Sequence, residues 1–409
     1  MLTQRIQAAM REQMAASGTP FYLYDQKTIL ERAGRLKQDF PGFEFLYSVK
    51  TNPFAPVLRT VLGQGFGLDA ASLGEVRMGM AEGLPPHKIL YSAPGKTRRD
   101  LEGAVDHAIL VADSFHELEL LDAIAQERGT QLKVGVRVNP SFTMEGNPGV
   151  SAKFGIDEEQ LLACDPGRFP HLALVGIHVH ARSQELSAQM LARYYGDIFA
   201  LARRCVERLG MALEFVNLGG GLGVTFNPDR DRELDTAALG AAAGKLLASL
   251  REQFPGVRVV IETGRYPVCD AGYYVTQVVD VKESRGTKYV MLQNTLNGFA
   301  RPSLARLVEV YHPGPVEKMW EPLFSTFDAF QFLLLTEETE TEQVNLVGNL
   351  CTGTDLMASG IQLPRAKVGD LLAVTKAGAY AYVITPTQFS SQPGPDQFLL
   401  TADGRMVDC

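Results

Sequence analysis

The stretch FEFLYSVKTN, Phe43–Asn52, sets the pattern that predicts the fold, because it is an apolar, aromatic run that ends on a lysine, Lys50. A short apolar run of this kind predicts a strand buried on both faces. Seven similar runs follow it before residue 265. The eight predicted strands fall within residues 43–50, 66–72, 88–94, 108–114, 131–139, 172–180, 214–221 and 258–264.

The segments between these runs carry apolar residues at helical spacing. Two examples are Ser72–Gly83 and Ser114–Arg128, and each opens on a serine suited to capping a helix. Doubly buried strands that alternate with helices pair in parallel, and eight such units close a (β/α)8 barrel, the TIM barrel. We therefore predict an α/β fold of this class. An open, doubly wound sheet fits the same alternation and stands as the alternative.

The pattern changes after Arg265. Residues 272–294 predict two strands joined by a glycine-containing turn, and further β-rich runs occupy residues 343–350 and 371–383. The intervening residues 301–323 are rich in proline and are predicted to be irregular. We expect a second, mostly β domain after the barrel.

Composition excludes several classes of function. The 409 residues are 45% hydrophobic and carry 39 Lys and Arg against 47 Asp and Glu, a net charge of -8. With no basic run to follow a phosphate backbone, nucleic acid is not an expected partner. Neither a signal peptide nor a membrane span is indicated, so the protein is expected to be cytoplasmic. The five cysteines are odd in number and lack CxxC spacing, which predicts neither disulfides nor a zinc site.

Charged and polar residues gather at the ends of the predicted strands. In a (β/α)8 barrel the carboxyl ends of the strands meet at one mouth, where active sites lie. A core made only for packing does not need so many charges there. The residues concerned are Lys50, Asp69, Arg137, Asn139, His178, His180, Gly219, Gly220, Gly221, Glu262, Gly264 and Arg265.

Together these residues match a phosphorylated aldehyde cofactor. A strand-end lysine is usually solvated, but at a barrel mouth Lys50 would be desolvated and partly neutral, which suits Schiff-base chemistry. Glycines 219–221 offer backbone amides to a phosphate, although such a run also marks tight turns. His180 would stack on a heterocycle or simply be a core histidine. A carboxylate such as Glu262 keeps a pyridine nitrogen protonated, unless it only pairs with Arg265.

At this point the sequence resembles the fold type III pyridoxal-phosphate decarboxylases, which include diaminopimelate and ornithine decarboxylases. The matching blocks run through nearly the whole chain in family order, and they are specific jointly rather than singly. The blocks are FYLYD (21–25), YSVKTN (47–52), GLDAASLGE (67–75), SAPGKT (92–97), VRVNP (136–140), KFGI (153–156), GIHVHARSQ (176–184), NLGGGLGV (217–224), ETGRY (262–266), RPSL (301–304), CTGTD (351–355) and GAY (378–380).

The resemblance implies a role for each matching residue, with pyridoxal 5'-phosphate as the cofactor. Lys50 would form the Schiff base with it, His180 would stack on its ring and Glu262 would pair with its pyridine nitrogen. Family members are homodimers with shared active sites, so Cys351 and Asp355 would come from the partner subunit. The expected phosphate-binding residues are Ser183, Gly220, Gly221, Gly264, Arg265 and Tyr380, supported by Asp69 and Arg137.

The resemblance also implies a discontinuous second domain. The family fold places the N-terminal residues with the C-terminal β domain. The predicted domains are therefore residues 26–265 for the cofactor-binding barrel, and residues 1–25 with 266–409 for a β domain that contributes to the dimer interface and the active site.

Departures from the family pattern bear on the substrate. Diaminopimelate decarboxylases usually carry a glutamate after the cysteine of the CTGTD block and a tyrosine after RP-A-L, where this chain has Thr352 and Ala305. Diaminopimelate is therefore disfavoured. The Cys-Thr start resembles the siderophore and antibiotic branch, of the staphyloferrin B, achromobactin or vibrioferrin type, whose members decarboxylate free or conjugated amino acids. Arg182, Arg301 and Arg306 are the candidate carboxylate-binding residues, with Thr352 also near the substrate.

The predicted reaction is loss of CO2 from the substrate's Cα, with no metal and no redox step. Cys351 or Lys50 would return a proton to that carbon. The alternatives are decarboxylation of diaminopimelate or another diamino acid, amino-acid racemisation on the same fold, and an inactive pyridoxal-phosphate-binding regulator. Retention of Lys50, Cys351 and Asp355 argues against the last.

Overall fold

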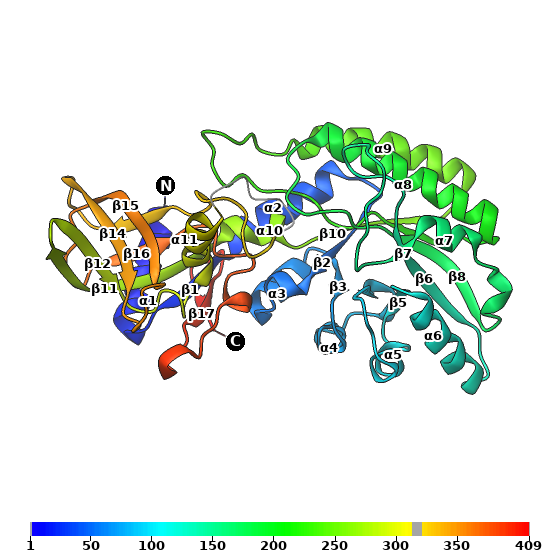
Figure 1. Ribbon diagram of the computed structural model, residues 1–409, viewed down its shortest axis with the longest axis horizontal. Coiled ribbons are helices and arrows are strands. Elements are labelled where there is room, and N and C mark those ends of the chain that lie inside the picture. Colours follow the sequence, from blue (N-terminus) through cyan, green and yellow to red (C-terminus); the bar gives the residue numbers. More distant parts are fainter. Residues whose placement is uncertain (1, 313–320, 409) are drawn as a thin grey trace.

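The computed structural model describes residues 2–312 and 321–408, which build two large sheets toward opposite ends of the molecule (Figure 1). In the first sheet, eight parallel strands close into a barrel. A ninth strand, β7 (Ile156–Asp157), pairs with β6 and is not part of the closed ring. The closure confirms the (β/α)8 barrel over the open sheet, and each of the eight predicted runs holds one strand. The barrel strands are β2 (Glu44–Ser48), β3 (Gly67–Ala70), β4 (Ile89–Tyr91), β5 (Ile109–Ala112), β6 (Leu132–Asn139), β8 (Leu172–His178), β9 (Phe215–Asn217) and β10 (Arg258–Thr263).

Helices cover the outside of the barrel (Figure 1). The two predicted serine caps are present, because Ser72 and Ser114 each accept a hydrogen bond from the backbone N–H three residues on. No helix in residues 2–312 and 321–408 has the length and apolar character to cross a membrane. The barrel helices are α2 (Gln26–Asp39), α3 (Ala55–Leu62), α4 (Leu73–Ala81), α5 (Arg98–Ala104), α6 (Phe115–Glu127), α7 (Glu158–Ala163), α8 (Ala188–Leu209) and α9 (Thr236–Gln253), with short 3-10 turns η1 (Val49–Thr51), η2 (Pro86–Lys88) and η3 (Pro166–Arg168).

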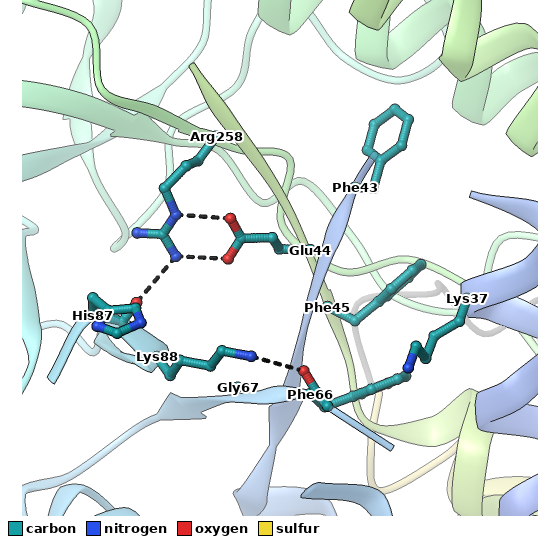
Figure 2. Close-up of a pocket in the computed structure, with 10 residues that line it drawn as sticks. Lys37, Phe43, Glu44, Phe45, Phe66, Gly67, His87, Lys88 and Arg258 are labelled. Carbon is teal, nitrogen blue, oxygen red and sulfur yellow. Dashed lines mark hydrogen bonds and ion pairs between the residues drawn. The ribbon is translucent and has the colours of Figure 1, made fainter. Parts of the chain in front are cut away.

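A small cavity of about 270 Å³ lies at the base of the barrel, where the strands begin (Figure 2). The Arg258 guanidinium donates from Nε and Nη2 to the Glu44 carboxylate at 2.8 and 2.7 Å, and a third bond reaches the His87 carbonyl at 3.0 Å. Lys88 Nζ donates to the Gly65 carbonyl at 3.0 Å. These bonds tie the starts of neighbouring strands together.

The barrel interior is packed with apolar side chains. Phe215 occupies the space that Gly135 and Gly176 leave, since a Cβ on either glycine would lie within 2.6 Å of its ring. Val260 and Glu262 are two residues apart on β10 and so face the same side of the strand. The inner face therefore changes from apolar to charged toward the strand ends. The interior cluster comprises Leu46, Leu90, Val111, Val175, Phe215 and Val260.

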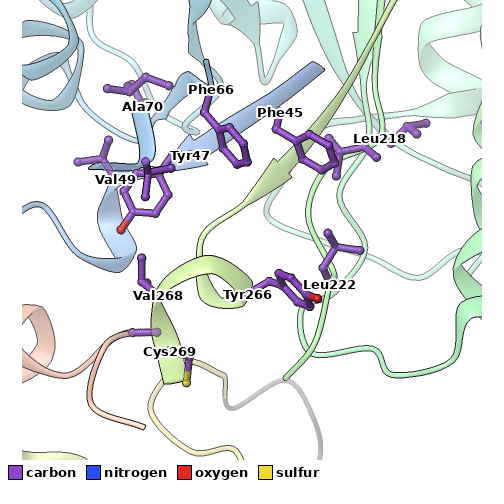
Figure 3. Packing of buried hydrophobic residues seen from close by; sticks show 14 of the residues in the cluster. Phe45, Tyr47, Val49, Phe66, Ala70, Leu218, Leu222, Tyr266, Val268 and Cys269 are labelled. Atoms are coloured by element: carbon purple, nitrogen blue, oxygen red, sulfur yellow. The ribbon is translucent and has the colours of Figure 1, made fainter. Parts of the chain in front are cut away.

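The main core lies between the barrel wall and the elements outside it (Figure 3). Phe45 and Tyr47 alternate with the interior residue Leu46 on β2, so they face outward into this core. Phe45 stacks on Phe66 with ring centroids 5.3 Å apart. Val49 continues the buried run, so β2 is anchored up to the residue before Lys50.

The second sheet joins the two ends of the chain. β1 (Phe21–Asp25) lies between β11 (Gly272–Ser284), to which it is antiparallel, and β17 (Asp396–Leu400), to which it is parallel. Helix α1 (Gln4–Ser17) packs Met10 and Met14 against this sheet. The remaining elements are α10 (Arg265–Val268), η4 (Cys269–Ala271), β12 (Thr287–Leu292), α11 (Ala300–Tyr311), β13 (Phe332–Leu335), β14 (Thr341–Gly348), β15 (Leu356–Pro364), β16 (Leu371–Val374), η6 (Tyr382–Ile384), η7 (Phe389–Ser391) and β18 (Met406–Val407).

Two expectations for this region were wrong. Part of the stretch predicted to be irregular, residues 301–323, forms α11, because Pro302 lies in the first turn, where no backbone N–H is needed. Of that stretch, residues 313–320 lie outside the described residues. Only Leu371–Val374 of the β-rich run 371–383 is a strand, and the chain then turns back toward the barrel. The domain boundaries at residues 25 and 265 stay a prediction.

Candidate active site

A cavity of about 520 Å³ opens at the carboxyl ends of the barrel strands. Its volume falls within the range of small-molecule sites. Most residues predicted from the sequence line it, and Glu321 and Pro322 are among the wall residues that were not predicted. The predicted residues on the wall are Lys50, Arg137, His180, Arg182, Ser183, Gly220, Gly221, Glu262, Gly264, Arg265 and Tyr380.

Lys50 stands in the 3-10 turn η1 that follows β2. Its Nζ lies 2.8 Å from Oδ2 of Asp69, a buried carboxylate that also accepts from Ser48 Oγ at 2.7 Å. Burial favours a neutral amine, but Asp69 and Glu262 outweigh it and raise the pKa of Lys50 above its ordinary value. This direction is opposite to the expectation of a partly neutral lysine, and it favours an ammonium group held by Asp69.

Glu262 presents an ionised carboxylate from the inner face of β10. Asn217 Nδ2 donates to its Oε1 at 2.8 Å, and His178 Nε2 lies 3.3 Å from the same oxygen. Burial alone would raise the pKa of Glu262, but His178 and Lys50 hold that pKa well below its usual range. Glu262 can therefore stabilise a positive charge brought into the cavity. Its supporting residue Asn217 was missed, although it stands next to the glycine run.

His180 is a neutral imidazole. Its Nδ1 accepts a hydrogen bond from the Gly220 backbone N–H at 3.0 Å. Burial, reinforced by Arg137, lowers the pKa of His180 to about 3. An uncharged, oriented ring on the cavity wall suits contact with a flat ligand.

The glycine run is shaped by close backbone contacts. Gly219 has φ +68°, and a Cβ there would lie 2.3 Å from the Val179 carbonyl oxygen. The Gly219 amide donates to Asn217 Oδ1 at 2.9 Å, and the Gly220 amide is taken by His180. The run thus leaves fewer amides for an anion than the sequence predicted. Gly264 is required for a similar reason, since a Cβ there would lie 2.0 Å from Thr51 Oγ1.

Arg265 provides a buried cation at the cavity wall. Its guanidinium lies 5.1 Å from the ring centroid of Tyr380 and 5.6 Å from that of Phe226. Nη2 forms an ion pair with Glu321, whereas the buried Nη1 has no hydrogen-bond partner. Such an unused donor next to glycine-rich backbone fits a phosphate group. Arg137 adds a second cation, 4.4 Å from the Phe154 ring.

The three arginines expected to bind a substrate carboxylate are already engaged. Arg182 lines the cavity but forms ion pairs with Glu145 and Glu185. Arg301 does not line the cavity: it is 1% exposed and donates to the Ala379 carbonyl at 3.3 Å and to Ser325 Oγ at 2.6 Å.

Burial lowers the pKa of Arg301 to about 10, so the group still carries its charge near neutral pH. Arg306 lies on the exposed side of α11, where it pairs with Glu309 and donates to the Phe327 carbonyl. The buried Nε of Arg182 and that of Arg301 have no hydrogen-bond partner in the described part of the chain, whereas the Nη atoms of all three arginines are bonded inside the protein.

The CTGTD block lies in the turn between β14 and β15, away from the cavity wall of its own chain. Cys351 is exposed, with Sγ 3.8 Å from Ser390 Oγ, and Thr352 Oγ1 bonds Thr354 Oγ1 at 2.9 Å. Asp355 is different. It is 3% exposed, and its carboxylate accepts bonds from Thr295 Oγ1 and from two backbone amides, those of Leu296 and Leu350, each at 3.0 Å.

Asp355 therefore anchors the turn through three accepted hydrogen bonds. Its predicted catalytic role stays a prediction.

The barrel, the cavity and the second sheet define a class of protein. Residues 26–269 match the family described as pyridoxal-dependent decarboxylase, pyridoxal binding domain. The chain belongs to this family: it is a pyridoxal-phosphate-dependent amino-acid decarboxylase. The site fits the cofactor, because ionised Glu262 suits its pyridinium, the idle Nη1 of Arg265 suits its phosphate, and Lys50 supplies the amine.

Particular relatives place the chain within this class. It is 29% identical over 395 residues to the L-glutamyl-[BtrI acyl-carrier protein] decarboxylase of Niallia circulans, covering 93% of this chain and 88% of that protein. It is 28% identical to the diaminopimelate decarboxylase of Aquifex aeolicus (strain VF5), covering 96% and 89%. The crystal structure of diaminopimelate decarboxylase from Helicobacter pylori complexed with L-lysine superposes with a TM-score of 0.80 at 25% identity, covering 97% and 95%.

Proposed function

We propose that this enzyme decarboxylates a free or conjugated amino acid other than diaminopimelate, in siderophore or antibiotic biosynthesis. The observation that carries the proposal is the β14–β15 turn, where Thr352 stands beside Cys351 and its hydroxyl bonds Thr354. A threonine cannot form an ion pair with a distal ammonium as a carboxylate does. The buried Ala305 on α11 likewise brings no polar group. The relative from Niallia circulans, named for a carrier-bound glutamyl substrate, supports a conjugated substrate.

We assign the cofactor roles as follows. Lys50 holds the cofactor through its side-chain nitrogen, Glu262 faces the pyridine nitrogen and His180 lies against the ring. When bound, pyridoxal phosphate supplies an electron sink for the pair released by the departing carboxylate. The phosphate is assigned to Arg265 Nη1 with Ser183, Gly221, Gly264 and Tyr380, supported by Asp69 and Arg137. Gly220, whose amide is bonded to His180, lines the wall beside them.

The chain's own residues orient the reactants and move the proton. Asp69 keeps Lys50 protonated, so its Nζ carries a proton close to where Cα is held. The bond from Cα to the carboxylate carbon breaks, CO2 leaves, and Cα takes one proton in its place. Lys50 and Cys351 are the candidate donors for that proton.

We further propose a homodimer in which the partner subunit supplies Cys351 and Thr352. Neither residue lines the cavity of its own chain, and the exposed thiol faces away from its own core. A second copy that placed this turn over the barrel mouth would complete the site. Mixing the variants Lys50→Ala and Cys351→Ala tests this, because in a shared site the mixed dimer contains one unaltered site and is more active than either variant alone.

Mass spectrometry of products tests the function. The loaded enzyme is incubated with meso-diaminopimelate, lysine, ornithine, 2,4-diaminobutyrate, 2,3-diaminopropionate and citryl conjugates of the last two. Loss of CO2 from a conjugate, or from a diamino acid other than diaminopimelate, supports the proposal. Preferred turnover of diaminopimelate would contradict it and favour the second candidate function, which the names of several relatives support.

A further inference from the structure

Glu321 is a cavity residue to which the family resemblance assigns no role. It lies on the wall of the same cavity as Lys50 and Glu262, and its side chain is 10% exposed. One oxygen, Oε2, pairs with Nη2 of Arg265. The other, Oε1, is buried and accepts no hydrogen bond. Glu321 therefore holds an idle acceptor in a site that is built to take a ligand.

A buried carboxylate oxygen without a partner needs a hydrogen-bond donor. Leaving such an oxygen unpaired costs free energy, and a carboxylate can only accept when it is ionised. Arg265 fixes the direction of the carboxylate through Oε2. The group that satisfies Oε1 must then be a donor that the cavity admits. Pyridoxal phosphate brings acceptor oxygens at its phosphate end and does not fit this role.

The arginines also favour a nitrogen donor over a second carboxylate on the substrate. Arg182, Arg301 and Arg306 each bond inside the protein through both Nη atoms, so a ligand carboxylate would have to displace these partners to form a bidentate pair. A ligand carboxylate near Glu321 would also be repelled by it. The cavity is better prepared for a nitrogen donor at the far end of the substrate than for a second carboxylate.

We propose that Glu321 determines specificity by accepting a hydrogen bond, through Oε1, from a nitrogen on the substrate side chain. That nitrogen is the ammonium of a free diamino acid or the amide N–H that remains after it is conjugated. The inference rests on the proposed function, because it assumes that an amino acid occupies this cavity. Arg265 then serves both ends of the site: Nη1 faces the cofactor phosphate and Nη2 holds Glu321.

Binding of product amines tests the proposal without catalysis. Calorimetric titration of the cofactor-loaded protein compares each diamine from ethylenediamine to cadaverine with the monoamine of equal chain length. The wild type should bind one diamine about tenfold to a hundredfold more tightly than its monoamine, the effect of one charged hydrogen bond. Mono-N-acetylated diamines separate the two sources of the donor: tighter binding of the acetylated form identifies a conjugated substrate.

Variants assign the preference to Glu321. Glu321→Gln should reduce the preference for the diamine to less than about threefold while leaving the affinity for pyridoxal phosphate, followed by absorbance, within about threefold of the wild type. Glu321→Asp keeps the charge on a shorter arm and should move the preference to a longer diamine. The matched control is Glu309→Gln at an exposed position of α11. This variant should change neither the diamine affinity nor the affinity for pyridoxal phosphate.

The outcomes separate this inference from the proposed function. It is overturned if no diamine exceeds its monoamine, if Glu321→Gln keeps the preference, or if ligands ending in a carboxylate bind more tightly. Failure of the proposed function has a different signature, which is that the loaded enzyme releases CO2 from none of the panel or mainly from diaminopimelate. If only the proposed function fails, the protein should still bind diamines more tightly than monoamines, and this preference should still depend on Glu321.

Discussion

The two ends of the barrel both carry charged cavities, but their polar groups are used in opposite ways. At the base, Arg258 donates to Glu44 and to the His87 carbonyl, and Lys88 donates to the Gly65 carbonyl (Figure 2). At the mouth, Arg265 Nη1 and Glu321 Oε1 are buried and have no partner. In this fold the strand starts serve stability and the strand ends serve chemistry. Both ends of the barrel carry charged residues. The mouth differs in having buried donor and acceptor atoms that no group of the described residues bonds.

The sharpest test of this difference replaces one lysine with alanine at each end of the barrel. Lys50→Ala should lower kcat by on the order of a thousandfold or more, because it removes the cofactor's amine partner and a proton donor. Reduction with borohydride should no longer fix pyridoxal phosphate to the chain, as mass spectrometry would show. The control Lys37→Ala, on the wall of the basal cavity, should keep kcat within about twofold. Similar losses in both variants would break the comparison.

A carboxylate at each end gives the next largest effect. Glu262→Gln should lower kcat by about a hundredfold, because a neutral amide no longer stabilises charge at the pyridine nitrogen. Steady-state kinetics with the preferred substrate measure it, and the absorbance of the bound cofactor should also shift. Glu44→Gln at the base should leave kcat and the spectrum unchanged. An active Glu262→Gln enzyme would remove this residue from the mechanism.

Asp355 sharpens the comparison, because it is as buried as the cavity carboxylates yet accepts three hydrogen bonds from its own chain. Asp355→Asn should lower the free energy of unfolding by about 1–3 kcal/mol, since an amide cannot accept all three bonds. We also expect faster alkylation of Cys351, measured with iodoacetamide under native conditions, because the turn that carries it loosens. The exposed Asp229→Asn serves as control. Unchanged stability and alkylation would show that the turn does not depend on Asp355.

The smallest effect is expected from the basal ion pair itself. Arg258→Ala should lower the free energy of unfolding by about 0.5–1 kcal/mol, a value limited by the partial exposure of both side chains. Activity at saturating substrate should stay the same. Thermal unfolding of the purified variant beside the wild type measures the first quantity, and the decarboxylation rate measures the second.

The pH dependence of this stabilisation follows from Glu44. The hydrogen bond from Arg258 lowers the pKa of Glu44 in the folded state. A lowered carboxyl pKa stabilises the fold above the unfolded value, about 4.3, and that contribution disappears as the pH falls through the folded value. The difference between wild type and Arg258→Ala should thus be complete at pH 7, begin to shrink near the unfolded value and disappear at pH values below the folded one. A difference that grew in acid would contradict the assignment.

The barrel was predictable because its signals are local. Runs such as FEFLYSVK carry their own burial pattern, and Ser72 and Ser114 mark helix starts within a few residues. Strand ends then located Lys50 and Glu262. The charge state of Lys50 was not predictable in this way, because it depends on how closely Asp69 approaches, and spacing along the chain does not fix that distance.

Residues from distant segments escaped the sequence for the same reason. Glu321 reaches the cavity from a stretch that was predicted to be irregular, and no periodicity or motif marks it. Asp355 shared a block with Cys351, so its burial was hidden by the resemblance. Whether such a carboxylate anchors a turn or contacts a substrate depends on its bonding partners. One of these partners, Thr295 Oγ1, is far away in sequence.

The position of β1 between β11 and β17 affects how the protein is made. Barrel strands are complete once Thr263 has left the ribosome, so the first sheet can close while synthesis continues. β1 is made earlier than all of them but must wait for both of its neighbours, the later of which ends at Leu400. During that interval its apolar residues Phe21 and Leu23 are open to other chains. Truncation at the C-terminus, distant in sequence from Lys50, would prolong this exposure indefinitely and favour aggregation.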